Sequence, residues 1–521
     1  MRNMVQHGKI FVPESKRAEL MKSQSSTPAY SGAGNNRALR GWSVNAREDA
    51  YLDDVDTLTE RSRDLCRNNS LARGIIEKSK VSTIGEGLQP QSRIDAEYLG
   101  LSEEKTAELQ KQIEREFRFF AETNECDAGR RHTFYGLQPL IFSTVMRDGN
   151  ALALLPFIPR GQTYNLCIQT ILGTRLQNPN STMDTDKLKG GVELGYYGDP
   201  VAYHISSTNT FGMTTSTKRV PAFGKESGRR NVLHIYLADD PNQIKGVPLL
   251  SSVIETVKQV GRISAAEAQA LVVQSQWAVF IENPDLELDP NPDRRKTDID
   301  IDVGGVYELA AGEKINMATP TRPNTSFEPF LMALFKQIGM AMQIPFEILI
   351  NHFQASYSAS RGAKIEHWKK IMMDRSWFID QFCQPVYNEV LREGVLRGRL
   401  NLPGFLEDPA IRASYCRAEW IGTNMGQLDP LKEVRAAVEA IQGMLSTHQG
   451  ETARLNGGDF DSNVSQLKRE TTALSGVQFG NDTVPPAALP PDAAANQAIT
   501  PENFYVALEN IVRGIMEEFQ N

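Results

Sequence analysis

Apolar side chains recur every three to four residues along much of the chain, a pattern typical of amphipathic helices. Three such stretches lie in the first third, over residues 48–85, 102–124 and 133–148. After residue 240 the pattern returns, and it predicts helices over 249–281, over 327–342, over 361–397, from Asp429-Pro430 onward, and from Asp461-Ser462 to about 474. Helices therefore form the framework of the predicted fold.

Between residues 150 and 237 apolar and polar positions alternate, as they do in half-buried β-strands. The predicted strands are Ala151–Ile158, Leu166–Ile171, Val192–Tyr197, Val201–Ile205 and Val232–Tyr236. Turns rich in Gly, Pro and Asn separate them. The pattern indicates an α+β fold with a β-rich part inside a helical framework.

The helix predicted over 249–281 has one apolar face and an opposite face rich in Ala, Ser, Gln and Thr. An isolated surface helix normally carries more charge, so this face suits packing against other helices, including further copies of the chain. Residues 282–326 contain five prolines and cannot form a helix. Strands are predicted there at Val306–Leu309 and Lys314–Met317, which makes this block a compact β-containing tip.

The composition is that of a soluble globular chain. The chain has 521 residues, of which 40% are hydrophobic and 23% charged, and this length suggests roughly three to four folding units. No apolar stretch reaches the about 18 residues that a spanning helix needs, so no membrane contact is expected. Five widely spaced cysteines form no CxxC pair, which favours reduced, mostly buried thiols in a protein made in a cytoplasm.

The net charge of −8 excludes a protein that grips nucleic acid over its whole surface, although it allows DNA to pass without being gripped. Residues 1–47 differ, with eight basic side chains against two acidic ones. They are predicted to be a flexible basic arm, which is either a solvated tail or a contact to an acidic partner or nucleic acid. Residues 475–521 are predicted to be a flexible Pro/Ala-rich linker followed by an amphipathic helix.

Sequence motifs for common chemistry are missing. There is no GxxxxGK[ST] phosphate loop, no HExxH zinc motif and no GxSxG nucleophile elbow. Asp298, Asp300 and Asp302 alternate along a possible strand, where they are either a divalent-metal site or, as we favour, a solvated acidic face. We expect no enzyme activity, no metal and no cofactor.

Four stretches resemble the lambda-type family of tailed-bacteriophage portal proteins. They lie in the family's order along the chain and span most of it, from about residue 60 to about 470. They are residues 61–69 (RSRDLCRNN) with 84–88 (IGEGL), residues 240–249 (DPNQIKGVPL), residues 357–361 (YSASR) and residues 428–433 (LDPLKE).

The resemblance implies a portal fold with a mainly helical wing, stem and crown, a β-rich part in the wing and a small α/β clip, assembled as a ring. The implied regions are a wing over 48–247 that returns over 361–419, stem helices over 248–281 and 327–350, a clip over 282–326, a tunnel loop over 351–360 and a crown over 420–474.

The resemblance also implies the function. Portal proteins form a channel at one capsid vertex, usually from twelve subunits, through which double-stranded DNA is packaged by terminase and later ejected. The implied partners are further copies of the chain, the terminase large subunit, the major capsid and scaffold proteins, a head-completion or adaptor protein, and non-specifically passing double-stranded DNA. The implied location is the virion, after synthesis in the host bacterial cytoplasm.

Two sets of candidate site residues follow. DNA-facing candidates are Lys258, Arg262, Lys336, Gln354, Ser356, Tyr357 and Ser358. Candidates for docking partners at the clip are Asp293, Arg294, Arg295, Asp298, Asp300 and Asp302. The alternatives are another head–tail connector ring protein, which would normally be shorter, and a metal-dependent nuclease that uses the acidic cluster.

Overall fold

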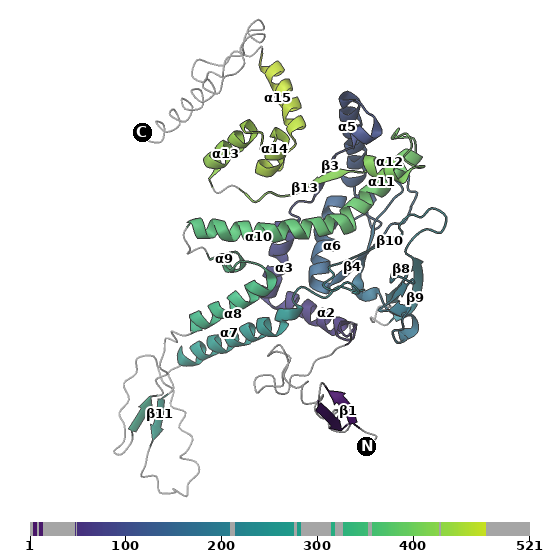
Figure 1. Cartoon of the computed structure of the whole chain (residues 1–521). Helices are drawn as coiled ribbons and strands as arrows, with labels where there is room; N and C mark the ends of the chain where they lie inside the picture. Colours follow the sequence, from purple (N-terminus) through teal and green to yellow (C-terminus); the bar gives the residue numbers. More distant parts are fainter. Residues whose placement is uncertain are drawn as a thin grey trace, which may run out of the picture. The chain divides into compact units, whose positions relative to one another are not determined.

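The computed structural model describes two short strands near the N-terminus and most of the chain from residue 47 to residue 475. The described residues are 4–7, 10–13, 47 and 49–475, without 209–213, 276–278, 283–313, 318–326, 353–356 and 427–428. Helices and sheets are both present, so the predicted α+β class is confirmed at this level (Figure 1). The chain divides into two units, Met1–Trp420 and Ile421–Asn521, which we describe separately.

The three helical stretches predicted in the first third are confirmed. They form α2 (Tyr51–Asn68), α3 (Ser70–Thr83), α5 (Glu103–Ala121) and α6 (Phe134–Asp148), and a short α4 (Ala96–Leu99) was not predicted. Asn69 separates α2 from α3 because its side-chain oxygen accepts the backbone N–H groups of Leu71 and Ala72, at 3.0 and 3.1 Å. Gly149, at φ +87°, ends α6.

The β-rich part contains two sheets. One has the order β10-β4-β5 and is antiparallel, with β4 (Asn150–Leu154), β5 (Gln169–Leu172) and β10 (Val232–Tyr236). The other has the order β6-β7-β8-β9, with β6 (Leu188–Lys189), β7 (Val192–Leu194), β8 (Pro200–Thr208) and β9 (Thr214–Pro221). Strand β9 was not predicted, because its segment TTSTKRVP lacks alternating apolar residues.

The long helix predicted over 249–281 is shorter in the structure. A 3₁₀ turn (Ser251–Val253) leads into α7 (Ile254–Ser275), and Val279–Glu282 forms strand β11, so the predicted helix over its last residues is wrong. Strand β11 pairs antiparallel with β12 (Lys314–Met317). Val279, Phe280 and Ile281 follow one another without the polar spacing that distinguishes a strand, which explains the error.

The second helical stretch begins with α8 (Phe327–Met342), as predicted, and continues with α9 (Phe346–Ile350). Helix α10 (Tyr357–Phe378) passes through a π-helical turn (Ile379–Cys383) into α11 (Gln384–Leu396). The first turn of α10 lies inside the segment predicted to be a loop over 351–360, so that prediction is wrong for Tyr357–Ser360. No proline or glycine interrupts YSASR, and the helix therefore begins before Arg361.

One hydrophobic core joins the helices of the first unit to the sheet β10-β4-β5. Its centre is aromatic: the ring of Phe134 lies 5.4 Å from that of Phe117 and stacks on Phe382 at 5.5 Å. Strand β13 (Ala418–Ile421) follows α12 (Pro409–Tyr415) and pairs with β3 (Gln89–Ser92), which brings distant parts of the chain together. Four of the five cysteines are buried and all are free thiols, as predicted.

The second unit begins at Ile421, the last residue of β13, and is mainly helical from Pro430 to Leu474. It contains α13 (Pro430–Gln442), α14 (His448–Asn456) and α15 (Phe460–Leu474). Asp429 caps α13, as the Asp-Pro pair predicted, by accepting the N–H of Lys432. The cap of α15 is Asp459 and not the predicted Asp461, and α14 was not predicted because it has no apolar stripe.

At the N-terminus, β1 (Met4–His7) and β2 (Ile10–Pro13) pair as an antiparallel hairpin inside the predicted arm. The rest of that arm before Arg47 and the predicted C-terminal helix lie outside the described residues. Among the helices that are described, none is long and apolar enough to cross a membrane.

Candidate nucleic-acid interface

Helices α7 and α8 pack side by side and are anchored in the core at one end (Figure 1). The buried side chains of Val253, Val257 and Val260 meet Ile338 and Met342 there. Val260 is the last buried residue in the described part of α7, and the remaining part of the helix leaves the core.

The helix pair also exposes apolar side chains. Leu271 and Val272 of α7 are 55% and 58% exposed, and Phe330 and Met340 of α8 are 51% and 81% exposed. On α7, three exposed alanines lie between the core and the pair Leu271 and Val272: Ala265, Ala266 and Ala268. A pair of helices with so large an apolar surface normally has a partner.

The three predicted DNA-facing cations of the helix pair are exposed. Lys258 and Arg262 lie one turn apart on α7, and Lys336 lies on α8 with its ammonium 5.6 Å above the ring of Phe346. None of the three forms an ion pair with another described residue. The acids of the two helices are Glu255, Glu267 and Glu328. The described helix pair is therefore neutral, and the overall charge of −8 is carried elsewhere.

A groove of about 710 Å³ lies between α8, α9 and the first half of α10. It contains two lysines whose charges are already matched: Lys370 donates to both carboxylate oxygens of Asp374, at 2.9 and 2.8 Å, and Lys369 donates to Glu366 at 2.6 Å. Lys336 is the lysine of this groove that has no carboxylate partner among the described residues. His367 lines the same groove, and burial lowers the pKa of its imidazole, so the ring is neutral at pH 7.

The predicted tunnel-loop residues are only partly described. Gln354 and Ser356 lie outside the described residues, as do the side chains of Tyr357 and Ser358. Before the loop, α9 ends at Asn351 in the left-handed conformation, and Lys78 of α3 donates to the carbonyl of Ile348 and to the Asn351 side chain. Hydrogen bonds from α3 thus hold the residues at the start of the loop in place.

After the loop, Arg375 of α10 forms hydrogen bonds to the C-terminal end of α3. Its guanidinium donates to the carbonyls of Thr83 and Ser82, at 2.6 and 3.2 Å, and lies 4.9 Å from the ring of Trp368. Burial lowers the pKa of Arg375 to about 10, so it stays charged at neutral pH. Sequence reasoning missed this residue, because a lone arginine in an amphipathic helix gives no signal of its partner.

The clip candidates stay a prediction. Asp293, Arg294, Arg295 and the three alternating aspartates 298, 300 and 302 all lie outside the described residues. Within the described part of the chain, no cluster of three or more His, Cys, Asp or Glu side chains is arranged to hold a metal ion.

The sequence profile of the family described as phage portal protein, lambda family, matches residues 35–375. Portal protein B of Escherichia phage lambda is 24% identical over 485 residues, which cover 84% of this chain and 88% of that protein. The portal protein of Escherichia phage N15 is 24% identical over 489 residues, covering 84% and 89%.

Among solved structures, a chain from the neck of a native gene transfer agent (GTA) particle, computed with C12 symmetry, aligns with 84% of this chain and 98% of its own length. Its sequence identity is 13% and the TM-score is 0.42. The family match spans the helix pair α7 and α8, the groove beside Lys336 and most of α10. Since that match covers well over half of the 521 residues, the chain belongs to the lambda family of phage portal proteins.

Proposed function

We propose that the chain is the subunit of a ring whose central channel admits double-stranded DNA during packaging and releases it during ejection. As a lambda-family portal protein it is a virion component of the capsid vertex. The observation that carries the ring proposal is the helix pair, which leaves Leu271, Val272, Phe330 and Met340 exposed in a single copy. Neighbouring copies packed side by side would remove this apolar surface from water.

The regional assignment is part of the proposal. Helices α7 and α8 serve as stem, the segment between them as clip, the β-rich part and α10–α11 as wing, and the helices of the second unit as crown. The clip docks terminase and the head-completion protein, and its charged side chains tune the rate and choice of partner. Replacing Asp298, Asp300 and Asp302 by Lys should weaken terminase docking to purified rings.

A ring of twelve subunits would carry twelve times −8, or −96 charges. Each phosphate that a protein neutralises adds affinity through counterion release, so a conduit needs few cationic contacts. Lys258, Arg262, Lys336 and the loop before α10 are proposed as these sparse contacts. If Gln354→Ala together with Tyr357→Ala left packaging and DNA retention unchanged, the loop would have no such role.

The test of ring formation is negative-stain electron microscopy of the purified full-length protein, with mass measured in parallel. We expect rings with a central hole and a mass near twelve times 58.0 kDa. The variant Ala268→Glu places a charge on the exposed face of α7 and should shift the protein to monomers. Ala410→Glu, at an exposed helical alanine of α12, is the matched control and should still form rings.

A monodisperse monomer in several salt concentrations, or rings that tolerate Ala268→Glu as well as Ala410→Glu, would contradict the proposed assembly. We also propose that the ring is not an enzyme. DNA cleavage by purified rings in the presence of magnesium or manganese would overturn that part.

A further inference from the structure

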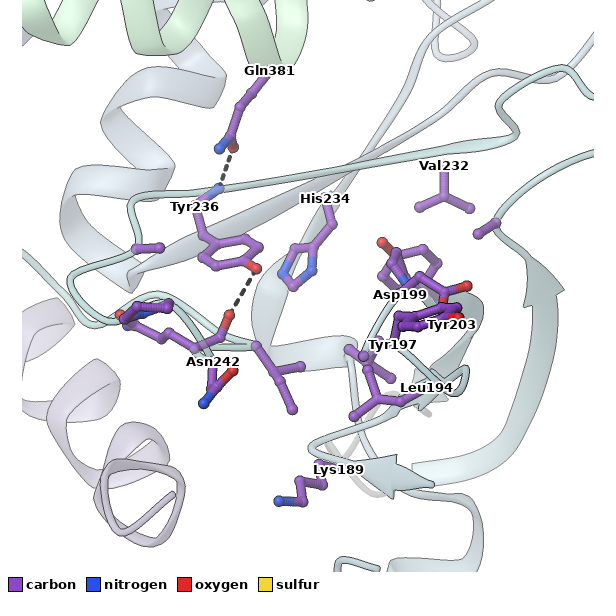
Figure 2. A pocket seen from close by; sticks show the side chains of 18 of the residues that line it. Lys189, Leu194, Tyr197, Asp199, Tyr203, Val232, His234, Tyr236, Asn242 and Gln381 are labelled. Atoms are coloured by element: carbon purple, nitrogen blue, oxygen red, sulfur yellow. Dashed lines mark hydrogen bonds between the residues drawn. The ribbon is translucent and has the colours of Figure 1, made fainter. Parts of the chain in front are cut away.

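A cavity of about 760 Å³ lies between the two sheets of the β-rich part and the π-helical turn (Figure 2). None of the described DNA-facing candidates is among its lining residues. Hydrogen bonds between side chains and the main chain hold its wall. The side chain of Gln381 accepts the N–H of Tyr236 at 2.9 Å, and the Tyr236 hydroxyl donates to the carbonyl of Gln243 at 2.9 Å. The π-helical turn places Asp380 and Gln381 at this wall, and such turns are frequent at functional sites.

Three aromatic rings line the inner part of the cavity. His234 lies between Tyr203 and Tyr236, with ring centroids 5.6 and 4.6 Å away. Its Nε2 atom is shielded from solvent and has no hydrogen-bond partner among the described residues. Burial lowers the pKa of His234 to about 3, so the imidazole stays neutral and adds no positive charge to the cavity. A buried nitrogen without a partner is costly, and a bound group that pairs with it would remove this cost.

The rim combines exposed aromatic rings with carboxylates. Tyr197 lines the cavity and is 91% exposed. Its ring meets that of the neighbouring Tyr196, which is 94% exposed, edge to face at 5.0 Å. Asp186, Asp199 and Asp380 line the cavity, and none of them forms an ion pair with a described residue.

Two cations also line the cavity, and both have partners. Lys189 donates to Asp49 at 3.1 Å, and the guanidinium of Arg230 lies 5.5 Å from the ring of Phe223. Asp49 also pairs with Arg47, so Lys189 stays in the charge count. Among the lining side chains, three carboxylates then stand against two cations, which gives the lining a net charge of −1. Its electrostatic complement is therefore a cation.

We propose that this cavity binds an arginine side chain presented by a polar peptide segment of a partner protein. A guanidinium is planar, stacks on tyrosine rings and offers a fork of N–H donors to carboxylates. It therefore suits a lining that includes Tyr197, Asp199 and Asp380 better than a lysine ammonium would. The proposal concerns protein docking on the β-rich part and does not depend on DNA passage.

The test uses the full-length protein and a fluorescein-labelled peptide of sequence GSRGSRG, with binding followed by fluorescence anisotropy. A second peptide in which citrulline replaces both arginines keeps the shape and removes the charge. We expect the arginine peptide to bind at least tenfold more tightly than the citrulline peptide. The variants D199N and D380N should each weaken binding about two- to fivefold, the range for single exposed ion pairs.

The variant Y197A should also weaken binding, while D461N, an exposed carboxylate outside the cavity, should leave it unchanged. Tyr197, Asp199 and Asp380 are exposed, so we expect these variants to keep the fold. Equal affinity for the two peptides, or no effect of D199N and D380N, would overturn the proposal. Binding that appears only after residues 1–46 are removed would assign the cavity to the chain's own basic arm and overturn the choice of a partner protein.

Discussion

At the scale of single residues, Asp148 is a buried charge with two arginine partners. Its side chain is fully buried and accepts two bonds from Arg63 and two from Arg147, all at 2.8 Å. Arg63 lies in the RSRDLCRNN stretch, so this ion pair gives a structural reason for an arginine there: it joins α2 to the end of α6.

Replacing Asp148 by Asn should lower the free energy of unfolding by about 2–3 kcal/mol, because two guanidinium groups would lose their charge partner. Urea unfolding measures this directly. The matched control is Asp64→Asn, an exposed carboxylate in the same stretch, which should change stability by less than about 0.5 kcal/mol. Equal effects of the two variants would contradict a special role for Asp148.

The same pair predicts a pH dependence. Burial acts to raise the pKa of Asp148, but the bonds from Arg147 and Arg63 outweigh it and hold the pKa below its ordinary value of 3.8. A depressed carboxyl pKa stabilises the folded state above the unfolded pKa, and this contribution is lost as the pH falls through the folded pKa. The stability difference between the protein and D148N should therefore be full at pH 7 and shrink below about pH 4. A difference that stays constant down to about pH 2 would refute this.

At the scale of elements, two glycines determine how the chain enters α7. Gly246, in the DPNQIKGVPL stretch, lies so close to Gly149 at the end of α6 that an added Cβ would sit 2.1 Å from the Gly149 carbonyl oxygen. Gly246→Ala should therefore destabilise the protein by about 3 kcal/mol, since backbone cannot move aside cheaply. Thermal unfolding of the two proteins measures the difference.

Gly74→Ala is the control for this prediction. Gly74 lies inside α3 and a Cβ there meets nothing within 4 Å, so alanine should stabilise the helix by about 0.5–1 kcal/mol. If Gly246→Ala were as harmless as Gly74→Ala, the close approach of α6 to the segment before α7 would not matter for stability.

At the scale of the whole molecule, the neutral helix pair makes a prediction about DNA. The combined variant Lys258→Ala, Arg262→Ala and Lys336→Ala should still form rings, bind double-stranded DNA more weakly and show a flatter dependence of log affinity on log salt. Filter binding at several salt concentrations measures both. Lys105→Ala, Lys111→Ala and Lys225→Ala remove the same charge from exposed sites outside α7 and α8. An equal loss in this control would argue against DNA contact at the helix pair.

The sequence alone predicted the elements whose signals are local. Helix α8 follows an apolar stripe, α13 begins at an Asp-Pro cap, and α6 stops at Gly149. Strand β10 was predicted with its observed bounds because it is a short run of mainly β-branched, aliphatic and aromatic residues, which favour strands. The four family stretches could also be recognised from sequence, although not what each residue in them contacts.

Other features depended on contacts between distant segments, which a linear pattern does not contain. Val279–Glu282 is a strand because Lys314–Met317 pairs with it, and β9 is a strand because β8 supplies its partner. The bonds between Arg63 and Asp148 join residues 85 positions apart, and the cavity around His234 draws on two sheets and a π-helical turn. The sequence thus determined the local elements and the family. The tertiary structure decided which strands pair, which charges are buried and where the cavity forms. The free energies of these features arise only when separate segments of the chain meet.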